Sequence, residues 1–275
     1  MINGLDRISA TFEMLREEGR AALMPYYTLG YPTPTRSLEV IASIASAGAD
    51  LIELGVPFSD PLADGPTIQR STQIALEQGM TVARCLDLVQ QVRSAGVRQP
   101  VLLMGYINPI LSYGIERYVT NAVGAGVDGF IIPDLPMEEA ETMEGICRLH
   151  DCALVYLASP ASTPDRLIAL AQRTTGFLYL ISLNGVTGAR DSLPVDLAEF
   201  VSRVKAVANT PLAVGFGIST PAQAAMVARL VDGVIIGSAL INAVAGSGDP
   251  AGAAGNYLRG IRAALEAADR TERVR

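Results

Sequence analysis

The sequence predicts an α/β fold, a (β/α)8 TIM barrel with an extra N-terminal helix. Eight short apolar segments recur along the 275 residues, and a segment with helical periodicity follows each of them. The apolar segments are nearly continuous, as strands are when both faces of a parallel sheet are covered. The chain length is close to the ~250 residues typical of such barrels. An open doubly wound sheet is the alternative, but the eightfold repeat and the lack of a Gly-x-Gly-x-x-Gly motif after the first segment favour the barrel.

The expected strands are short, and turns rich in Gly, Pro, Asp and Ser follow them. They cover residues 23–29, 51–56, 101–106, 129–133, 153–158, 177–183, 212–216 and 233–236. Helical spacing of apolar residues is clearest within residues 38–45, 86–92 and 167–171. The intervals after the second and sixth strands are longer than one helix requires. Since barrel active sites lie on the loops after the strands, function is expected in these two intervals.

A further helix is expected before the first strand, within residues 1–20. One of its faces carries the apolar side chains of Leu5, Ile8, Phe12 and Leu15. We expect this helix to cover the bottom of the barrel. No linker or low-complexity stretch interrupts the chain. Residues 1–275 are therefore expected to form a single domain, with residues 269–275 as a frayed tail.

The overall charge and the apolar content restrict the class of protein. The chain has 21 Lys and Arg against 28 Asp and Glu, a net charge of −7, which argues against a surface for nucleic acid or anionic membranes. No apolar run approaches the roughly 18 residues of a membrane span, and the charged N-terminal segment lacks the apolar core of a signal peptide. A cytoplasmic protein is expected. The three cysteines are an odd number without disulfide-framework spacing.

The scarcity of histidine and lysine restricts the chemistry. His150 and Lys205 are the only residues of their types, and both are expected on helices away from the site. A Ser-His-Asp triad, a zinc site of several histidines and a Schiff-base lysine are therefore not expected. Cys147, His150 and Cys152 lack a fourth metal ligand, so no metal site is expected. Carboxylates or tyrosines must then move the protons.

Glu53 interrupts an otherwise apolar strand. With a period of two, it shares a face with Leu51 and Gly55. If that face is the barrel interior, burial raises the pKa of the carboxyl group and suits it to proton transfer near neutral pH. The alternative is a carboxylate paired with arginine, but no arginine lies close by in the segment.

The loop of residues 57–66 holds two more carboxylates, Asp60 and Asp64, between three prolines. Prolines stiffen the loop, which favours a site at the barrel mouth. Asp-Pro and Asp-Gly are also ordinary turn signals, so turn chemistry is an equal alternative for the loop alone. Beside Glu53, the loop becomes a candidate source of a second acid or base.

Glycines follow the seventh and eighth expected strands, at residues 215–219 and 237–239. Loops at these two positions form the common phosphate site of such barrels, because backbone N–H groups there can approach an anion. The segment 184–190 is also glycine-rich and is a candidate active-site lid, with a surface loop as the alternative. Asp134 is either a partner contact or a structural cap.

These segments, in this order, resemble the α subunits of tryptophan synthase. The resemblance extends from the helix before the first strand to the short helix after the eighth. It is most specific over residues 52–69, where a strand glutamate precedes an aspartate by eleven residues within a proline-rich loop. Some relatives have Ser-Arg-Ser where this chain has residues 182–184, and some have Phe in place of Tyr26.

The resemblance implies a lyase of tryptophan biosynthesis that splits indole-3-glycerol phosphate into indole and glyceraldehyde 3-phosphate. It implies that Glu53 protonates indole C3 and takes the proton of the glycerol hydroxyl. Asp64 would hold the indole N–H and stabilise the ring cation. Thr187 would be the lid residue that contacts Asp64.

The resemblance also implies binding residues and a partner. The phosphate-binding positions are Gly188, Gly217, Gly237 and Ser238. The indole pocket would consist of Tyr26, Met104, Ile131, Leu157, Tyr179, Phe216 and Ile235. The partner would be a tryptophan synthase β subunit in an α2β2 tetramer, with pyridoxal phosphate held by that subunit and no cofactor in this chain. The expected partner contacts are Pro57, Asp60 and Asn108. A free-standing lyase and a non-catalytic, phosphate-binding regulatory subunit are the alternatives.

Overall fold

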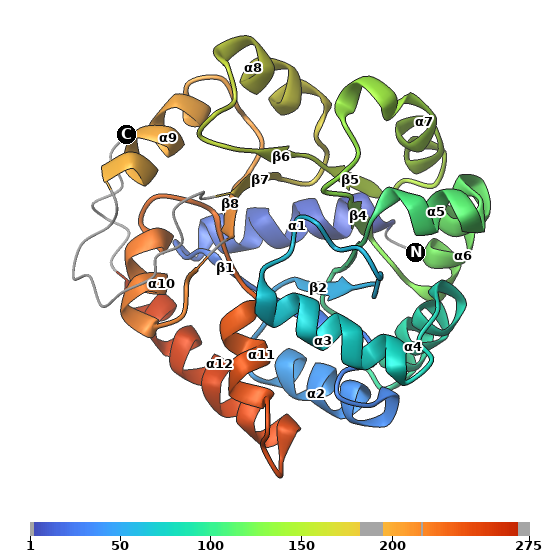
Figure 1. The fold of residues 1–275 in the computed structure, drawn as a ribbon. Coiled ribbons are helices and arrows are strands. Elements are labelled where there is room, and N and C mark those ends of the chain that lie inside the picture. The colour runs from blue at the N-terminus through green and yellow to red at the C-terminus, as the bar shows by residue number, and fades with distance from the viewer. Residues whose placement is uncertain (1–2, 182–194, 216, 269–275) are drawn as a thin grey trace.

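The computed structural model describes residues 3–181, 195–215 and 217–268. Its strands form one parallel sheet in the order β5-β4-β3-β2-β1-β9-β8-β7-β6, and helices surround the sheet in Figure 1. The strands are β1 (Ala22–Thr28), β2 (Ile52–Gly55), β3 (Val101–Met104), β4 (Gly129–Ile131), β5 (Ala153–Val155), β6 (Leu157–Ala158), β7 (Leu178–Ile181), β8 (Leu212–Gly215) and β9 (Gly233–Ile236).

The two ends of the sheet meet at one segment, which closes the barrel. β5 pairs with β4 and β6 pairs with β7, and Tyr156 alone separates β5 from β6. The fifth expected strand is therefore divided in two, a detail that the sequence did not predict. The Tyr156 N–H donates to Thr174 Oγ1 at 3.1 Å, and the Leu154 N–H donates to Thr175 Oγ1 at 2.8 Å. These hydroxyls satisfy backbone groups where the regular ladder is interrupted.

The helices lie mostly between successive strands, as the (β/α)8 prediction requires. They are α1 (Gly4–Glu17), α2 (Pro34–Ser46), α3 (Pro66–Glu77), α4 (Val82–Ser94), α5 (Ile107–Tyr113), α6 (Ile115–Ala125), η1 (Met137–Glu139), α7 (Glu141–Leu149), α8 (Pro164–Arg173), α9 (Val195–Lys205), α10 (Pro221–Ala228), α11 (Ser238–Val244) and α12 (Pro250–Ala267). Thr33, Thr163 and Thr220 cap the N-termini of α2, α8 and α10, and a proline follows each cap. None of the described helices has the length and apolarity to span a membrane.

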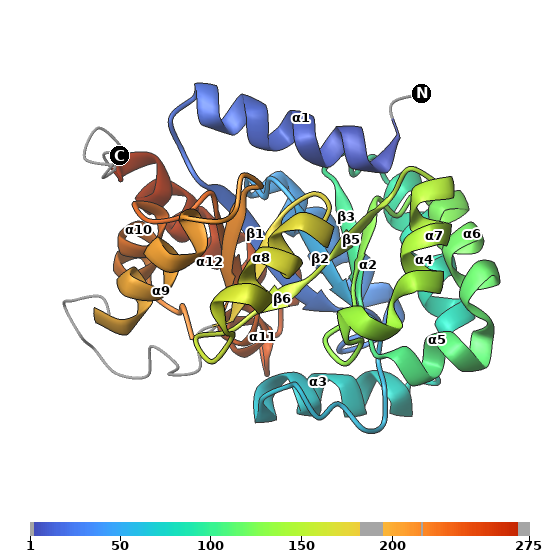
Figure 2. The same cartoon turned by 90° about the horizontal axis from the view of Figure 1, so that it is seen from above.

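Helix α1 closes the barrel at the amino ends of the strands, which confirms the expected bottom cover. Figure 2 shows it lying across one end of the barrel, with α3 at the opposite end. Ile8, Phe12 and Leu15 are buried, and they join the cluster of side chains that fills the barrel. The rings of Phe12 and Phe177 lie 5.9 Å apart between centroids. The site must therefore lie at the other end, which we call the mouth.

The strand register identifies the side chains that face the barrel interior. Directly paired residues of parallel strands point to the same face, and this face alternates along each strand. Glu53 pairs with Tyr26 on β1 and with Leu102 on β3. On the other side of β1, Met24 pairs with Ile235. These residues share the interior face, so Glu53 faces the inside of the barrel as the period of two predicted.

Candidate active site

Glu53 is the most unusual side chain of the interior. It is completely buried, at 0% exposure, between β1 and β3. Neither carboxylate oxygen has a hydrogen-bond partner among the described residues. Burial raises the pKa of Glu53 to about 8, because the charged form loses its hydration and no donor replaces it. This confirms the expected desolvation, and no arginine of the described residues pairs with Glu53.

The candidate pocket residues line the same interior. Ile131, Tyr179 and Ile235 are buried in the cluster that α1 closes from below, and Met104 and Leu157 pack against it. The register pairs Met104 with Ile131 and Leu157 with Tyr179, so each pair shares one face. Tyr26 is also buried, at 7% exposure. Phe216 lies outside the described residues.

Two glycines at strand ends make room for tyrosine hydroxyl groups. A Cβ atom on Gly55 would lie 2.0 Å from Tyr26 Oη, and one on Gly215 would lie 2.1 Å from Tyr179 Oη. Any larger residue would displace these tyrosines. The glycines that end β2 and β8 therefore allow the two phenol groups to reach across the mouth.

Asp64 lies on the loop between β2 and α3 and is partly buried. Its N–H donates to the Pro61 carbonyl at 3.0 Å, and its carbonyl accepts from Gln69 Nε2 at 2.8 Å. Burial raises the pKa of Asp64 to about 6, and a hydrogen bond from Tyr106 partly opposes this rise. Asp64 is thus ionised at neutral pH, whereas Glu53 is largely protonated.

Tyr106 holds this loop, and the sequence analysis did not identify it. Its hydroxyl oxygen accepts from the Ala63 N–H at 3.0 Å, so its proton is free to bond the Asp64 carboxylate. The ring lies 5.5 Å from that of Phe58, between centroids. One signal was available, because Tyr106 follows Leu102 and Met104 in steps of two along the interior face.

The two carboxylates face one site. Burial raises the pKa of Tyr179 far above its ordinary value, and the charges of Glu53 and Asp64 raise it further. Burial also raises the pKa of Tyr26, with further contributions from Asp64 and, more weakly, Glu53. The charges of both carboxylates affect the pKa of both tyrosines, so both carboxylates lie near these two side chains. The loop therefore brings Asp64 to the barrel opening above Glu53. A site of this kind can exchange a proton and stabilise a developing positive charge.

Glycines from two paired strands meet beside this opening. Gly215 on β8 pairs with Ile235 on β9, and Gly217 and Gly237 each lie two residues beyond that pair. Gly217 has a φ of +70°, a conformation that favours glycine. Ser238 is exposed and begins α11. The arrangement brings three of the four candidate phosphate-binding residues to one edge of the mouth, and Gly188 lies outside the described residues.

Comparison with known proteins identifies the family. The sequence profile of the tryptophan synthase alpha chain matches residues 12–263. The chain belongs to the tryptophan synthase alpha chain family. It is therefore a carbon–carbon lyase of tryptophan biosynthesis, and its reaction is the cleavage of indole-3-glycerol phosphate. This confirms the function that the sequence resemblance implied.

Individual relatives agree with this assignment. The tryptophan synthase alpha chain of Chloroflexus aggregans is 51% identical over 238 residues, covering 86% of this chain and 89% of the relative. That of Roseiflexus sp. is 45% identical over 260 residues, covering 94% and 100%. Among solved structures, tryptophan synthase subunit alpha from Legionella pneumophila has a TM-score of 0.89 at 39% identity, covering 97% of this chain and 99% of the other. A chain of Mycobacterium tuberculosis tryptophan synthase has a TM-score of 0.88 at 38% identity, covering 94% and 98%. These likenesses confirm the barrel fold.

The remaining candidate residues of this alpha chain have varied positions. Asp60 and Asn108 are exposed near the mouth, whereas Pro57 is buried. Asp134 Oδ1 accepts from the Ile107 N–H at 2.9 Å at the start of α5, so it is a structural cap. Thr187 and the candidate lid, residues 184–190, lie outside the described residues.

The histidine and the lysine of this alpha chain lie on helices outside the barrel interior. His150 ends α7 and contacts Thr120, and Lys205 is exposed in the last turn of α9. The described part of the chain contains no cluster of three His, Cys, Asp or Glu side chains that could hold a metal ion.

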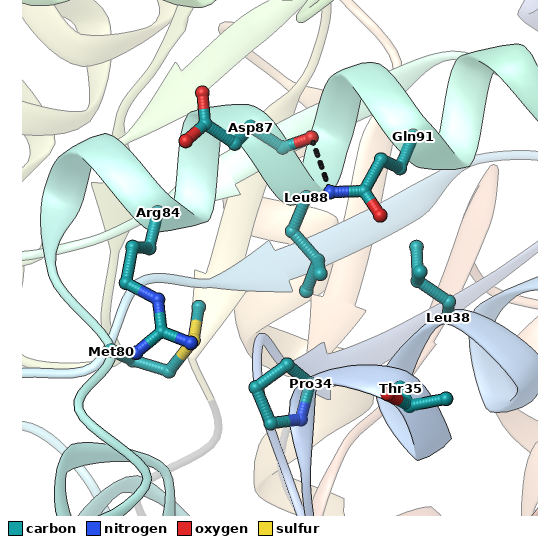
Figure 3. A pocket seen from close by; sticks show the side chains of 8 residues that line it. All are labelled: Pro34, Thr35, Leu38, Met80, Arg84, Asp87, Leu88 and Gln91. Atoms are coloured by element: carbon teal, nitrogen blue, oxygen red, sulfur yellow. Dashed lines mark hydrogen bonds between the residues drawn. The ribbon is translucent and has the colours of Figure 1, made fainter.

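A separate cavity of about 170 Å³ lies at the periphery, between α2 and α4 (Figure 3). It is lined by Pro34, Thr35, Leu38, Met80, Arg84, Asp87, Leu88 and Gln91. Arg84 donates to the carbonyl oxygens of Gln78 and Gly79. The volume is below that of common metabolite sites. We therefore place the active site of this alpha chain at the mouth and not in this cavity.

Proposed function

We propose that Glu53 and Asp64 carry the retro-aldol cleavage of indole-3-glycerol phosphate in this chain. The observation that carries the proposal is the contrast between them: a fully buried carboxyl group with a pKa of about 8 faces the same tyrosines as a carboxylate with a pKa of about 6. Two carboxyl groups whose environments separate their pKa values are suited to different roles in one reaction. Glu53 is the proton carrier and Asp64 is the fixed negative charge.

In the proposed reaction, protonated Glu53 gives its proton to C3 of the indole ring, which becomes a cation. The ionised Asp64 accepts a hydrogen bond from the indole N–H and stabilises that positive charge. The Glu53 carboxylate then takes the proton of the glycerol hydroxyl. The C–C bond breaks, and its electron pair returns to the ring as indole leaves. Glu53 ends the cycle protonated, as it began. The apolar interior would enclose the indole ring and exclude water from it.

The phosphate of the substrate is proposed to bind at the glycine edge of the mouth. Gly217 and Gly237 lack side chains that would block backbone N–H groups, and Ser238 begins a helix beside them. By family resemblance, Gly188 would also bind the phosphate and Thr187 would be the lid residue; both lie outside the described residues.

We expect Gly217→Val and Ser238→Asp each to weaken binding of the substrate and of glycerol phosphate by about tenfold to a hundredfold. Valine is strained at a φ of +70°, and aspartate repels the phosphate. Affinities measured by calorimetry test this, with free indole as the control ligand because it carries no phosphate. Equal losses for indole and glycerol phosphate would place the phosphate elsewhere.

The partner is proposed to be a tryptophan synthase β subunit, in an α2β2 tetramer in the cytoplasm. That subunit would hold pyridoxal phosphate and receive the indole, and this single-domain chain would use no cofactor of its own. The exposed Asp60 and Asn108 lie near the mouth, where such a partner could contact the loop that carries Asp64. A partner that orders this loop would complete the site.

We expect the isolated chain to turn over slowly and saturating β subunit to accelerate it ~10–100-fold, which requires a differential affinity of roughly 1.4–2.8 kcal/mol for the active state. The test is a turnover assay with indole-3-glycerol phosphate, with and without the β subunit. Asp60→Ala should reduce the acceleration more than the basal rate. Full activity that saturating β subunit leaves unchanged would instead indicate a free-standing lyase and contradict activation by the partner.

A further inference from the structure

Ser219 is exposed, yet the protein holds each of its polar groups. It lies between Gly217, a proposed phosphate-binding residue, and the start of α10. Its N–H and its hydroxyl group both donate to Gln223 Oε1, at 2.9 Å and 3.1 Å. Its carbonyl oxygen accepts from the Tyr257 hydroxyl group at 3.0 Å. Water alone can satisfy an exposed serine, so these bonds indicate a turn whose shape matters.

Gln223 does more than cap a helix. In the capping box of α10, Thr220 Oγ1 accepts from the Gln223 N–H, and Gln223 Oε1 accepts from the Thr220 N–H, both at 3.2 Å. The two bonds from Ser219 are additional to this motif and end on the same oxygen. Gln223 is only 5% exposed, so its position is fixed by its surroundings. This glutamine therefore fixes two successive peptide groups, the one before Ser219 and the one after it.

Tyr257 fixes the same turn from a second helix. It belongs to α12, which packs against α10 (Figure 1). Burial raises the pKa of Tyr257 to about 12, so its hydroxyl group keeps the donor proton at neutral pH. The peptide group between Ser219 and Thr220 is thus held at both ends, by Tyr257 at its carbonyl oxygen and by Gln223 at its N–H. The proposed reaction uses neither side chain.

Gly217 lies between the end of β8 and this turn, so the chain is anchored on both sides of it. Gly217 is exposed, its φ is +70°, and its N–H has no acceptor among the described residues. An N–H that is already oriented binds an anion better, because ordering the chain on binding costs conformational entropy. We propose that Gln223 and Tyr257 are positioning residues, which hold the turn at Ser219 and thereby orient the Gly217 N–H toward the phosphate of the substrate. This role rests on the proposed phosphate site and adds two residues that lie behind it.

The test is calorimetric titration of the purified full-length chain with glycerol phosphate and, separately, with indole, which carries no phosphate. Tyr257→Phe removes one hydroxyl group and keeps the ring, and Gln223→Met removes the acceptor and keeps the length of the side chain. We expect each variant to bind glycerol phosphate about threefold to tenfold more weakly, with unchanged affinity for indole. The double variant should lose less than the product of the two single losses, because both residues hold one turn. In turnover, KM should rise by a larger factor than kcat falls.

Two matched controls remove the same kinds of bond elsewhere in the barrel. Tyr27→Phe removes a hydrogen bond from a tyrosine hydroxyl group to a loop carbonyl, that of Tyr31. Thr163→Ala removes the N-cap of α8. Both controls should lower the Tm as the test variants do, but leave the affinity for glycerol phosphate unchanged. Gly217→Val, measured alongside, reports on the phosphate site itself.

Unchanged affinity for glycerol phosphate in Tyr257→Phe and Gln223→Met, together with a loss in Gly217→Val, would overturn the positioning role and leave the proposed phosphate site intact. Equal losses for glycerol phosphate and indole would also overturn it, since they would reflect a general loosening of the barrel. If Gly217→Val leaves the affinity unchanged, the phosphate lies elsewhere, and the site and the positioning role both fail. Tyr257→Phe keeps the ring in place, so it decides the question even if Gln223→Met does not fold.

Discussion

Replacement of Glu53 by glutamine is expected to reduce kcat for indole-3-glycerol phosphate by about 10⁴-fold or more. The amide keeps the shape of the side chain but cannot give or take the proton, and loss of one acid or base commonly costs ~10²–10⁴-fold. Glu53 serves two transfers in the proposed reaction, so its loss should lie at or beyond the upper end. Steady-state kinetics with and without the β subunit measure the effect.

The variant must be folded for this result to have meaning, and the burial of Glu53 provides the control. In the native state the Glu53 carboxyl group retains its proton up to about pH 8. In the unfolded chain the same group releases its proton near pH 4.3. The free energy of unfolding therefore declines as the pH rises between these two values. Glutamine removes this contribution, so Glu53→Gln should melt at or above the Tm of the parent at pH 8. Ligand affinity should be nearly unchanged, and a folded Glu53→Gln protein with near-normal turnover would refute the assignment.

The pH dependence of the parent enzyme follows from the same two carboxyl groups. Glu53 must begin protonated, so kcat/KM, which reports the ionisations of the free enzyme, should fall above its pKa of about 8. Asp64 must be ionised, so kcat/KM should fall below its pKa of about 6. We therefore expect a bell-shaped profile with a maximum between these values.

The sequence was sufficient to predict the barrel, the bottom helix and the position of Glu53 because each depends on a local repeat. A carboxylate at an interior position of an apolar strand is visible in the period of two alone. The Asp64 loop was identifiable because its prolines and carboxylates are adjacent in the chain. In each case, residues that act together are also neighbours in the sequence.

The remaining features depend on contacts between distant segments. The hydrogen bond between Tyr257 and Ser219 joins residues 38 apart in the chain, and neither residue indicates such a partner in its own segment. The break at Tyr156 depends on threonine hydroxyls that follow α8. The period of two places Tyr106 on the interior face. Its hydrogen bond to the Asp64 loop could not be predicted, because it depends on how that loop folds. Sequence patterns indicate which face a residue occupies but not which partner it finds there.

Replacement of Asp64 by asparagine is expected to reduce kcat by about 10²–10³-fold, with a smaller effect on KM. Protonation of the indole ring at C3 creates a positive charge that the ground state lacks, so a fixed negative charge acts mainly in the transition state. Asparagine can still accept the hydrogen bond of the indole N–H, but it has no charge to offer. Steady-state kinetics at pH 7 measure the two parameters separately.

The pH profile of Asp64→Asn separates the charge from the general loss of a side chain. Asparagine does not titrate, so the fall in kcat/KM below pH 6 should disappear, whereas the fall above pH 8 should remain because Glu53 is unchanged. Asp60→Asn is the matched control: it changes an aspartate of the same loop that is exposed, and its profile should keep both limbs. A large rise in KM with kcat unchanged would show that Asp64 only binds the substrate. If the fall below pH 6 persisted in Asp64→Asn, a group other than Asp64 would cause it. The argument for a fixed negative charge at Asp64 would then fail.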